Sequence, residues 1–200
     1  MTEIETLSQP KAVAMADELY QFGTEDHFWM QWRHFQVLRA LRSAKVPISR
    51  GLEIGCGRAV ARKMLERDLD VPVDGCDLNR AGLEMAEPAR GRLFFYDILE
   101  LNPSLLAQYD AVFLLDVVEH IRDDAAFLRA ALQYLRPGGV IVVNVPASLL
   151  LFSQYDRVTG HFRRYTRRSL ADLFRRCGVE PGGLNHWGLS MVPVLLTRKM

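Results

Sequence analysis

An acidic residue, Glu53, stands inside a hydrophobic run just before a Gly-Cys-Gly turn, in the segment GLEIGCGRAVARKML (51–65). Gly55 and Gly57 let the backbone approach a ligand closely, and the turn leads into the N-terminus of an expected helix, which favours negative charge. Asp77 follows Gly57 by twenty positions (77 − 57), the spacing at which an acid after a second strand binds both hydroxyls of a ribose. The pattern therefore predicts a site for a nucleotide-like cofactor.

A second group of chemically capable residues is Asp116, Glu119 and His120, spaced D-x-x-E-H, with His161 further along the chain in GHFRRYT. An imidazole beside a reacting group can remove its proton, so His120 and His161 are the candidate general bases, and Glu119 is a candidate substrate contact. The same hard carboxylate oxygens and imidazoles can bind a divalent cation. The residues alone leave open a simple base, a metal site or a structural role for either histidine.

Four arginines surround Tyr165 in HFRRYTRR (161–168). Guanidinium groups match the oxygens of a phosphate or carboxylate, so Arg163 and Arg164 beside Tyr165 predict a clamp for an anionic substrate. The alternative is an ordinary solvated loop and first helical turn. Because the formal net charge of the whole chain is only +1, the cluster is too local to favour nucleic acid as the substrate.

The elements around these residues have to position them. Short apolar runs predict β-strands at 52–55, 73–77, 92–97, 110–116 and 140–145, and helix-like stretches lie between them. Nearly continuous apolar strands that alternate with helices indicate an α/β fold, with a doubly wound, mostly parallel sheet and helices on both faces. In such sheets ligands bind beyond the carboxyl ends of the strands, which is where the candidate residues fall.

The first forty residues are also expected to be helical, with Phe28, Trp32, Phe35 and Leu38 at helical spacing on one apolar face. Further helices are expected over about ten residues after the glycine turn, over 79–88, over 125–135 behind an Asp123 or Asp124 cap, and from a Thr166 cap to Gly178.

The composition indicates one globular domain in a reducing compartment. The 200 residues are 49% hydrophobic and 24% charged, and no apolar run reaches the ~20 residues needed to span a bilayer. The N-terminus shows no apolar signal-peptide core, and the three cysteines are an odd number without CxxC spacing. We therefore expect a cytoplasmic protein with reduced thiols, without a disulfide framework or a zinc site.

Two details weigh against a dinucleotide at the glycine turn. The third glycine of G-x-G-x-x-G would fall at position 60, which is Val60, and dinucleotide sites usually keep an apolar strand residue at the position of Glu53. A buried acid there needs hydrogen-bond partners, and a cationic ligand can supply them.

In their order along the chain, LEIGCGRA, VDGCDLN, FFYDILEL, YDAVFLLDVVEHI and LRPGGVIVVNVPA resemble the successive motifs of class I S-adenosylmethionine (SAM)-dependent methyltransferases, over residues 50–147. The stretches EDHFWMQWR and SQYDRVTGHFRRYTRRSLADLF resemble a bacterial subgroup of that family, marked by DVVEHI and GHFRRYT. The resemblance implies a Rossmann-like methyltransferase core over 47–200, SAM as cofactor and S-adenosylhomocysteine as product. It also implies that the helical segment 1–46 covers the SAM pocket as a lid, where Arg33 would reach the methionine carboxylate.

The same resemblance implies a role for each position of the cofactor site. Glu53 would orient the ammonium group of SAM, Asp77 would bind the ribose hydroxyls, and Asp97 would accept a hydrogen bond from the adenine amino group. The remaining positions would make closer contacts: Gly55, Cys56, Gly57 and Asp116 with the methionine part, Leu78 with the adenine, and Ile98 beside Asp97. Cys56 is expected to be a small buried residue without nucleophilic reactivity.

The spacing D-x-x-E-H is similar to E-x-x-E-H in metal-dependent O-methyltransferases of quinone biosynthesis and in small-RNA 2′-O-methyltransferases. That similarity implies a metal set of Asp116, Glu119, His120 and His161. Asp116 is one carbon shorter than glutamate, and many metal-free relatives also carry E-H here, so the leading expectation is a site without a metal.

These observations predict SAM-dependent methyl transfer to an oxygen or nitrogen of a small, anionic molecule. The alternatives are an inactive SAM-binding partner or regulatory protein, a metal-assisted O-methyltransferase acting on vicinal or ribose hydroxyls, and a nicotinamide oxidoreductase. After Gly178 too few residues remain for both closing elements of the family's sheet, so we expect its last strand to be absent or rearranged. The apolar LSMVPVLL (189–196) is a candidate contact in a homodimer or with a membrane surface.

Overall fold

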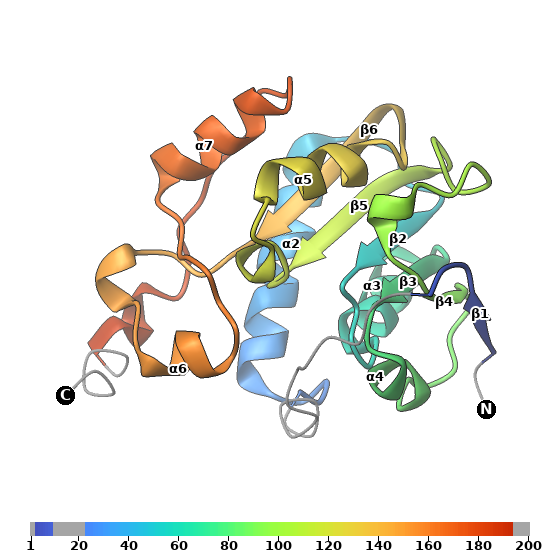
Figure 1. Ribbon diagram of the computed structural model, residues 1–200, viewed down its shortest axis with the longest axis horizontal. Helices are drawn as coiled ribbons and strands as arrows, with labels where there is room; N and C mark the ends of the chain where they lie inside the picture. Colours follow the sequence, from blue (N-terminus) through green and yellow to red (C-terminus); the bar gives the residue numbers. More distant parts are fainter. Residues whose placement is uncertain (1–2, 10–22, 194–200) are drawn as a thin grey trace.

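The computed structural model describes residues 3–9 and 23–193. At its centre is a six-stranded sheet in the order β1-β4-β3-β2-β5-β6, in which every neighbouring pair is parallel (Figure 1). The strands are β1 (Ile4–Thr6), β2 (Gly51–Ile54), β3 (Val73–Asp77), β4 (Leu93–Phe95), β5 (Tyr109–Leu115) and β6 (Leu135–Asn144). All five predicted strands are therefore confirmed, and so is the doubly wound, mostly parallel fold.

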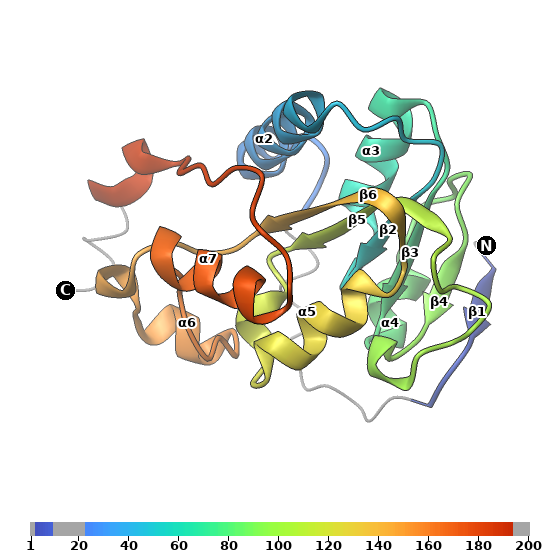
Figure 2. The same cartoon turned by 90° about the horizontal axis from the view of Figure 1, so that it is seen from above.

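Helices cover both faces of the sheet, as Figure 2 shows. On one face lie α2 (Phe28–Ala44) and α3 (Val60–Leu69), and toward the other lie α5 (Asp124–Leu132) and α7 (Arg167–Arg176). The connections hold α4 (Arg80–Glu84), α6 (Gln154–Val158) and four 3₁₀ turns, η1 (Ile98–Glu100), η2 (Val118–His120), η3 (Leu149–Leu151) and η4 (Leu189–Met191). Among the described helices, none is both long and apolar enough to cross a membrane.

The described residues form three apolar clusters, and the two larger ones, one on each face of the sheet, explain why the strands carry unbroken apolar runs. Side chains alternate in direction along a strand. In β5, Val112 and Leu114 therefore join the core under α5 and α7, whereas Ala111 and Phe113 join the core under α2 and α3. Because both faces of β5 are buried, its sequence does not alternate between apolar and polar residues. Polar side chains appear only near the two ends of the strand.

The face of α2 that packs against the sheet is only partly the predicted one. Phe28 and Phe35 are each 55% exposed. The buried positions of this helix are Arg33, His34, Val37 and Leu41. The helix itself is confirmed, but only part of the predicted face is buried. Leu38 packs against the core, whereas two of the buried positions hold charged or titratable groups that find partners elsewhere in the fold.

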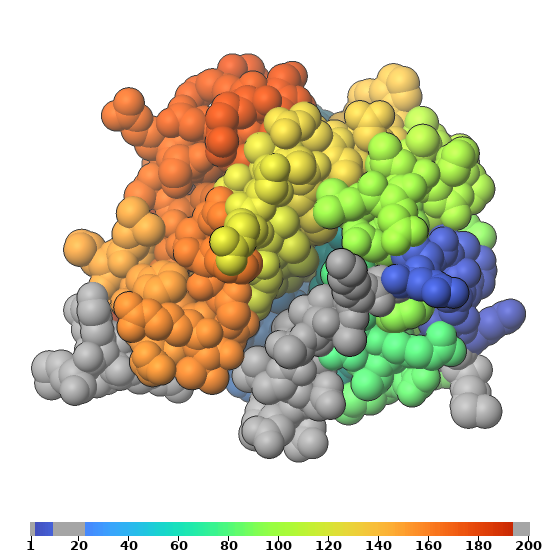
Figure 3. Space-filling view, in the orientation of Figure 1, coloured from blue at the N-terminus to red at the C-terminus, as the bar shows by residue number. Residues whose placement is uncertain are grey.

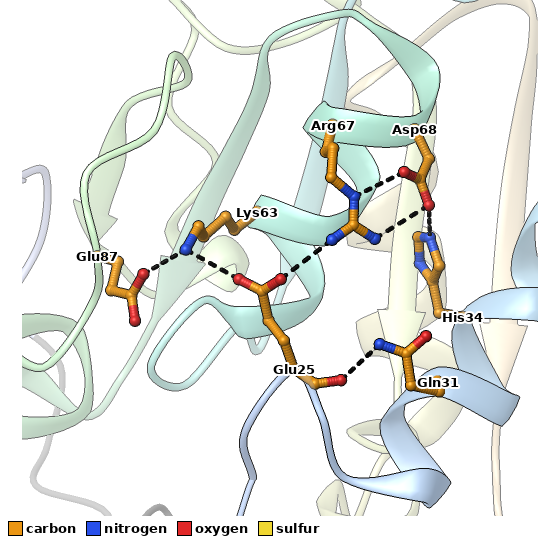
Figure 4. Close-up of polar contacts among 7 residues, drawn as sticks. All are labelled: Glu25, Gln31, His34, Lys63, Arg67, Asp68 and Glu87. Atoms are coloured by element: carbon orange, nitrogen blue, oxygen red, sulfur yellow. Dashed lines mark hydrogen bonds and ion pairs between the residues drawn. The ribbon is translucent and has the colours of Figure 1, made fainter.

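A polar network holds α2 and the turn before it against α3 (Figure 4). Its members are Glu25, Gln31, His34, Lys63, Arg67, Asp68 and Glu87. The carboxylate of Glu25 bridges Lys63 at 2.9 Å and Arg67 at 3.1 Å. On the next turns of the helices, Nε2 of His34 lies 2.7 Å from Oδ2 of Asp68. These contacts fix the rotation of α2 about its own axis.

The N-terminal segment differs from the predicted helix. Ile4–Thr6 form β1, which extends the sheet beside β4. The pairing continues past the strand, because Leu7 donates its N–H to the carbonyl of Phe95 at 3.1 Å and the N–H of Asp97 donates to Oγ of Ser8 at 2.8 Å. A three-residue strand at an edge has too few positions to show a period in the sequence. Residues 10–22, within the predicted lid, lie outside the described residues.

At the opposite edge the sheet ends with β6. Between residues 145 and 193 the described chain adds no strand to it, and only an isolated bridge joins Ala147 to Tyr165. Residues 194–200 lie outside the described residues, so the expectation of a missing or rearranged last strand stays a prediction. In Figure 3 the segment after β6 (orange) lies beside α5 (yellow), away from the β1 edge (blue). Leu189, in η4, is 67% exposed, and residues 194–196 of the apolar C-terminal segment lie outside the described residues.

Candidate functional site

The glycine turn after β2 is as tight as its sequence predicts. Gly55 has φ +75° and Gly57 has φ +53°, a backbone region that glycine enters without a steric cost. A Cβ on Gly55 would lie 2.6 Å from Cγ2 of Val117, so the turn after β2 and the turn after β5 touch each other. The two loops thus form one continuous floor at the carboxyl edge of the sheet.

Asp77 borders this floor and is held in place by backbone donors. Its Oδ2 accepts the N–H of Gly57 at 2.7 Å, and its Oδ1 accepts the N–H of Asn79 at 2.8 Å. Burial raises the pKa of Asp77, whereas the backbone hydrogen bonds, including one from Leu78, lower it. A carboxylate fixed in this way at the end of the second strand of a βαβ unit suits the recognition of a ribose.

Two buried glutamates, Glu66 and Glu53, differ in the number of hydrogen-bond donors around their carboxylates. Glu66 is fully satisfied, because its carboxylate accepts N–H groups from Val73, Arg90 and Gly91 at 2.6–3.0 Å. Glu53 is equally buried, yet its Oε2 has no hydrogen-bond partner. Among the buried carboxylates of the described chain, only Glu119 shares this property, again at Oε2. A buried acceptor without a donor costs stability, so both positions are candidate ligand contacts.

Burial raises the pKa of Glu53 to about 7, although the positive charges of Arg33 and Arg62 and a hydrogen bond from the Arg62 backbone oppose the shift. The acid is therefore close to half ionised near neutral pH and would be fully ionised beside a cation. An ammonium group at this place supplies both the missing donor and the missing charge.

A chain of hydrogen bonds crosses the ends of β5 and β6. Arg33 on α2 donates to Oδ2 of Asp116 at 2.6 Å, and Oδ1 of Asp116 accepts from the side-chain amide of Asn144. The oxygen of that amide accepts the indole N–H of Trp187 at 2.8 Å. Trp187 in turn packs on Trp29, with ring centroids 4.5 Å apart. This chain ties α2 and the C-terminal segment to the floor of the site.

Asp116 adopts φ +58°, an uncommon conformation for a residue with a side chain. Such strained positions cluster at functional sites, where surrounding contacts hold them. Arg33 also acts electrostatically on Glu53, and its contact with the methionine carboxylate stays a prediction.

Glu119, His120 and His161 come together beside Asp116. One candidate ligand atom from each lies within 4.8 Å of the others, and the two imidazole rings meet edge to face with centroids 4.6 Å apart. Burial, and then the charge of Asp116, raise the pKa of Glu119 well above its usual range. Burial and the neighbouring His161 lower the pKa of His120 to about 4, so this imidazole is neutral at physiological pH.

His161 is positioned by a residue that the sequence did not single out. Asp156 is fully buried, and its Oδ1 lies 2.9 Å from Nδ1 of His161. Arg164 donates to both oxygens of the same carboxylate, at 2.7 and 3.1 Å. The available signal was the S-x-x-D capping box at Ser153, which does form at the start of α6 and fixes Asp156 there.

The predicted anion clamp finds no support in these contacts. Arg164 is turned inward to Asp156, and Arg163 donates to Oδ2 of Asp124 at 2.7 Å. The hydroxyl of Tyr165, which is buried, donates to the same oxygen of Asp124 at 3.0 Å. Both guanidinium groups and the phenol are thus engaged with buried acids of the fold itself, and contact with an anionic substrate stays a prediction.

The remaining predicted cofactor positions differ in their surroundings. Cys56 is buried, burial raises its thiol pKa well above the usual range, and its sulfur faces Gly75, so it is not a reactive thiolate. Asp97 accepts the N–H of Leu99 at 2.9 Å, which caps η1. Ile98 is only 2% exposed and packs in the core, whereas Leu78 is half-buried at the end of β3.

The site therefore fits a cofactor that carries a ribose and an amino-acid moiety. The unpartnered oxygen of Glu53 fits an ammonium group, the turn at Gly55 and Gly57 admits a close backbone contact, and the carboxylate of Asp77 at the end of β3 suits ribose hydroxyls. On a parallel sheet of this order, these features define a SAM-dependent methyltransferase.

The comparisons with known proteins agree. A family model described as Methyltransferase domain matches residues 20–181, so the chain belongs to this family of methyltransferases. A ubiquinone biosynthesis O-methyltransferase of Marinobacter nauticus is 26% identical over 172 residues, which cover 76% of this chain and 71% of that protein.

Solved structures show the same fold. A SAM-dependent methyltransferase from Archaeoglobus fulgidus superposes with a TM-score of 0.61 and 18% identity, covering 90% of each chain. A 1,6-didemethyltoxoflavin-N1-methyltransferase of Burkholderia thailandensis, with S-adenosylhomocysteine bound, superposes with a TM-score of 0.59 and 21% identity, covering 76% of this chain and 68% of that one.

Proposed function

We propose that the chain transfers the methyl group of SAM to an oxygen of a small molecule. The observation that carries the proposal is the group of Glu119 and His120, in the turn after β5, and His161, in the loop after α6, with one candidate ligand atom from each within 4.8 Å of the others. A hydroxyl has to lose its proton as it is methylated, and imidazole or carboxylate groups serve that need. A neutral amine offers its lone pair without a base, so the group favours oxygen over the equally predicted nitrogen. The ubiquinone biosynthesis O-methyltransferases among the relatives point the same way.

On the donor side, SAM supplies a methyl group already activated on a sulfonium, so the protein chiefly has to hold and orient it. In this proposal Glu53 accepts hydrogen bonds from the ammonium group, Asp77 accepts them from the ribose hydroxyls, and Asp97 accepts one from the adenine. Arg33, which α2 carries and which pairs with Asp116, donates to the methionine carboxylate in this proposal. The predicted lid function is kept in this proposal for α2 alone, since Ile4–Thr6 belong to the sheet.

On the acceptor side, His120 and His161 provide the proton acceptors. His120 is neutral at physiological pH, so its free nitrogen lone pair is available. The low pKa of His120 makes it a weak base on its own. In this proposal His161, whose ring is held by Asp156 at 2.9 Å, removes the proton. An anionic acceptor is not required by these contacts, because Arg163 and Arg164 are already engaged with Asp124 and Asp156.

A direct test uses 3,4-dihydroxybenzoate as probe, because it offers vicinal hydroxyls and a carboxylate in one molecule. Incubation with SAM should yield S-adenosylhomocysteine and a methyl ether that mass spectrometry detects, and His161→Ala should lower kcat by about 10²-fold or more. If a panel of phenols and alcohols gives no product while amines do, oxygen transfer is wrong. If no acceptor reacts while S-adenosylhomocysteine still binds, the result supports the alternative of an inactive SAM-binding partner or regulatory protein.

A second candidate is a metal-assisted form of the same reaction. It is favoured by the three candidate ligand atoms within 4.8 Å and by the unpartnered Oε2 of Glu119, which fits a hard divalent cation. The fourth predicted ligand, Asp116, is instead paired with Arg33 and Asn144. A bound cation would supply Lewis-acid polarisation of an acceptor hydroxyl. Binding of Mn²⁺ followed by electron paramagnetic resonance, lost in Glu119→Gln, tests the site independently of turnover, and activity that survives EDTA would count against it.

A further inference from the structure

Asp156 is a buried acid with a full set of partners, and one of these partners is a predicted catalytic residue. The carboxylate is fully buried and accepts from Arg164, from Ser153 and from the ring of His161. The backbone carbonyl of Asp156 also accepts the N–H of His161 at 2.7 Å. Two separate groups of one residue therefore hold both the main chain and the imidazole of His161.

We infer that Asp156 is a positioning residue for methyl transfer, which fixes the tautomer and the ring orientation of His161. Arg164 keeps the Asp156 carboxylate ionised through two donated hydrogen bonds, so its Oδ1 can only accept. The proton of a neutral His161 must then sit on Nδ1, 2.9 Å away. The other nitrogen, Nε2, is left with its lone pair. The inference rests on the proposed role of His161 and adds the residue through which that role is set.

The position of His161 relative to its neighbours shows why orientation matters. Its ring meets that of His120 edge to face at an interplanar angle of 85°, so a rotation about its side-chain bonds would break this contact. The N–H of Phe162 donates to the carbonyl of Glu119 at 2.9 Å, which joins the loop after α6 to the turn after β5. A histidine free to rotate would spend part of its time with the protonated nitrogen toward the acceptor, and could then not take its proton.

Arg164 completes the arrangement from the second side. Its side chain is nearly buried, donates to the backbone of Ala147 at 3.3 Å, and acts electrostatically on Glu119. It therefore connects the end of β6, the Asp156 carboxylate and the acid of the candidate site. This assigns to Arg164 a support role in place of the predicted contact with an anionic substrate.

Asp124 provides a matched control within the same region. It is also buried, and its Oδ2 accepts from the guanidinium of Arg163 at 2.7 Å and from the hydroxyl of Tyr165 at 3.0 Å. It thus resembles Asp156 in burial and in its arginine partner, but it does not touch a histidine of the candidate site. A loss caused only by breaking a buried ion pair should be similar in the two variants.

The test compares Asp156→Asn with Asp124→Asn, first by long-range ¹H–¹⁵N correlation spectra of the histidine rings with S-adenosylhomocysteine bound. We expect a protonated Nδ1 for His161 in the native protein, a mixture of tautomers in Asp156→Asn, and the native pattern in Asp124→Asn. This readout needs no acceptor, so it stands even if methyl transfer to oxygen fails. A native His161 with its proton on Nε2, or an unchanged tautomer in Asp156→Asn, would overturn the inference.

Turnover with the probe 3,4-dihydroxybenzoate adds the functional half of the test. Asp156→Asn should lower kcat by about 10- to 100-fold while the Kd for S-adenosylhomocysteine stays within about twofold. In a His161→Ala background the same substitution should change kcat by less than about twofold, because its effect passes through the missing ring. A full additional loss in that background, or an equal kcat loss in Asp124→Asn, would show that Asp156 only supports the fold.

Discussion

Replacing Glu53 by Gln should weaken cofactor binding and stabilise the fold at the same time. Burial raises the pKa of this carboxyl from 4.5 to about 7, and its Oε2 lacks a partner. Binding of an ammonium group requires the ionised form. Between about pH 8 and pH 6 the ionised fraction falls from about ten elevenths to about one eleventh, so the affinity for S-adenosylhomocysteine should fall about tenfold, or about 1.4 kcal/mol.

The effect on stability has the opposite sign. Below pH 4.5 the glutamate is protonated in the folded and unfolded chains alike, and its burial then costs no ionisation energy. Above about pH 7 it is ionised in both states, and the raised folded-state pKa corresponds to about 3 kcal/mol of lost stability. Glu53→Gln should therefore raise the unfolding free energy at pH 8 by up to about 3 kcal/mol, and the gain should vanish as the pH falls through this window.

Isothermal titration calorimetry with S-adenosylhomocysteine at a series of pH values, together with thermal unfolding, measures both effects. In Glu53→Gln the affinity should be lower and no longer pH-dependent in this range. Glu66→Gln is the control, since Glu66 is as buried but already accepts three backbone N–H groups. It should lose stability and keep the affinity. Affinity that does not change with pH in the native protein, or a destabilised Glu53→Gln, would refute the reasoning.

Three further substitutions probe the surroundings of the site. Gly55→Ala should lower stability by about 1 kcal/mol or more, because its Cβ would meet Val117 at 2.6 Å and its φ is +75°; thermal unfolding tests this, and Val117→Ala should restore part of the loss. Trp187→Phe removes the hydrogen bond to Asn144 and should cost about 1 kcal/mol of stability in denaturant unfolding; an unchanged midpoint would mean that the C-terminal segment is not anchored there. Arg163→Ala should lower stability and leave the KM for the probe acceptor unchanged, because its guanidinium serves Asp124; a raised KM with unchanged stability would restore the anion clamp.

The parts of the fold that depend on local pattern could be predicted from the sequence. The strand at 73–77 was predicted with its observed bounds, and the caps at Asp123 and Thr166 form with side chains that accept backbone N–H groups. Apolar runs, turn glycines and capping residues each act within a few positions of themselves, so their consequences can be read along the chain.

The face of α2 could not be predicted in that way. Arg33 is buried because it meets Asp116, 83 positions away, and His34 is buried because it meets Asp68, 34 positions away. A periodicity argument counts both as solvent-facing residues and assigns the apolar Phe28 and Phe35 to the core instead. Only the packing of α2 on α3 and on the sheet reverses that assignment.

The candidate site was predicted as a set of residues but not as a set of roles. Sequence position brought Glu53, Glu119 and His161 to the correct edge of the sheet, yet it also offered Arg163 and Arg164 as free cations. The two arginines differ from the site residues because their charges are paired with acids of the same fold. Such a pairing cannot be predicted from local sequence, since Asp124 lies 39 positions from Arg163.

This difference gives a physical reason to place function at Glu53 and Glu119. Other buried acids of the described chain, such as Glu66, Asp124 and Asp156, are saturated with donors. By contrast, Oε2 of Glu53 and Oε2 of Glu119 are buried without a hydrogen-bond donor. Each of these two oxygens therefore lowers the stability of the fold. Glu53 lies in β2 and Glu119 in the turn after β5, two neighbouring strands of the parallel sheet, and the loops that follow these strands meet at Gly55 and Val117. In the proposed function the methyl donor binds at Glu53 and the methyl acceptor near Glu119, and this binding offsets the loss of stability. Stability and activity should therefore respond to Glu53→Gln with opposite signs.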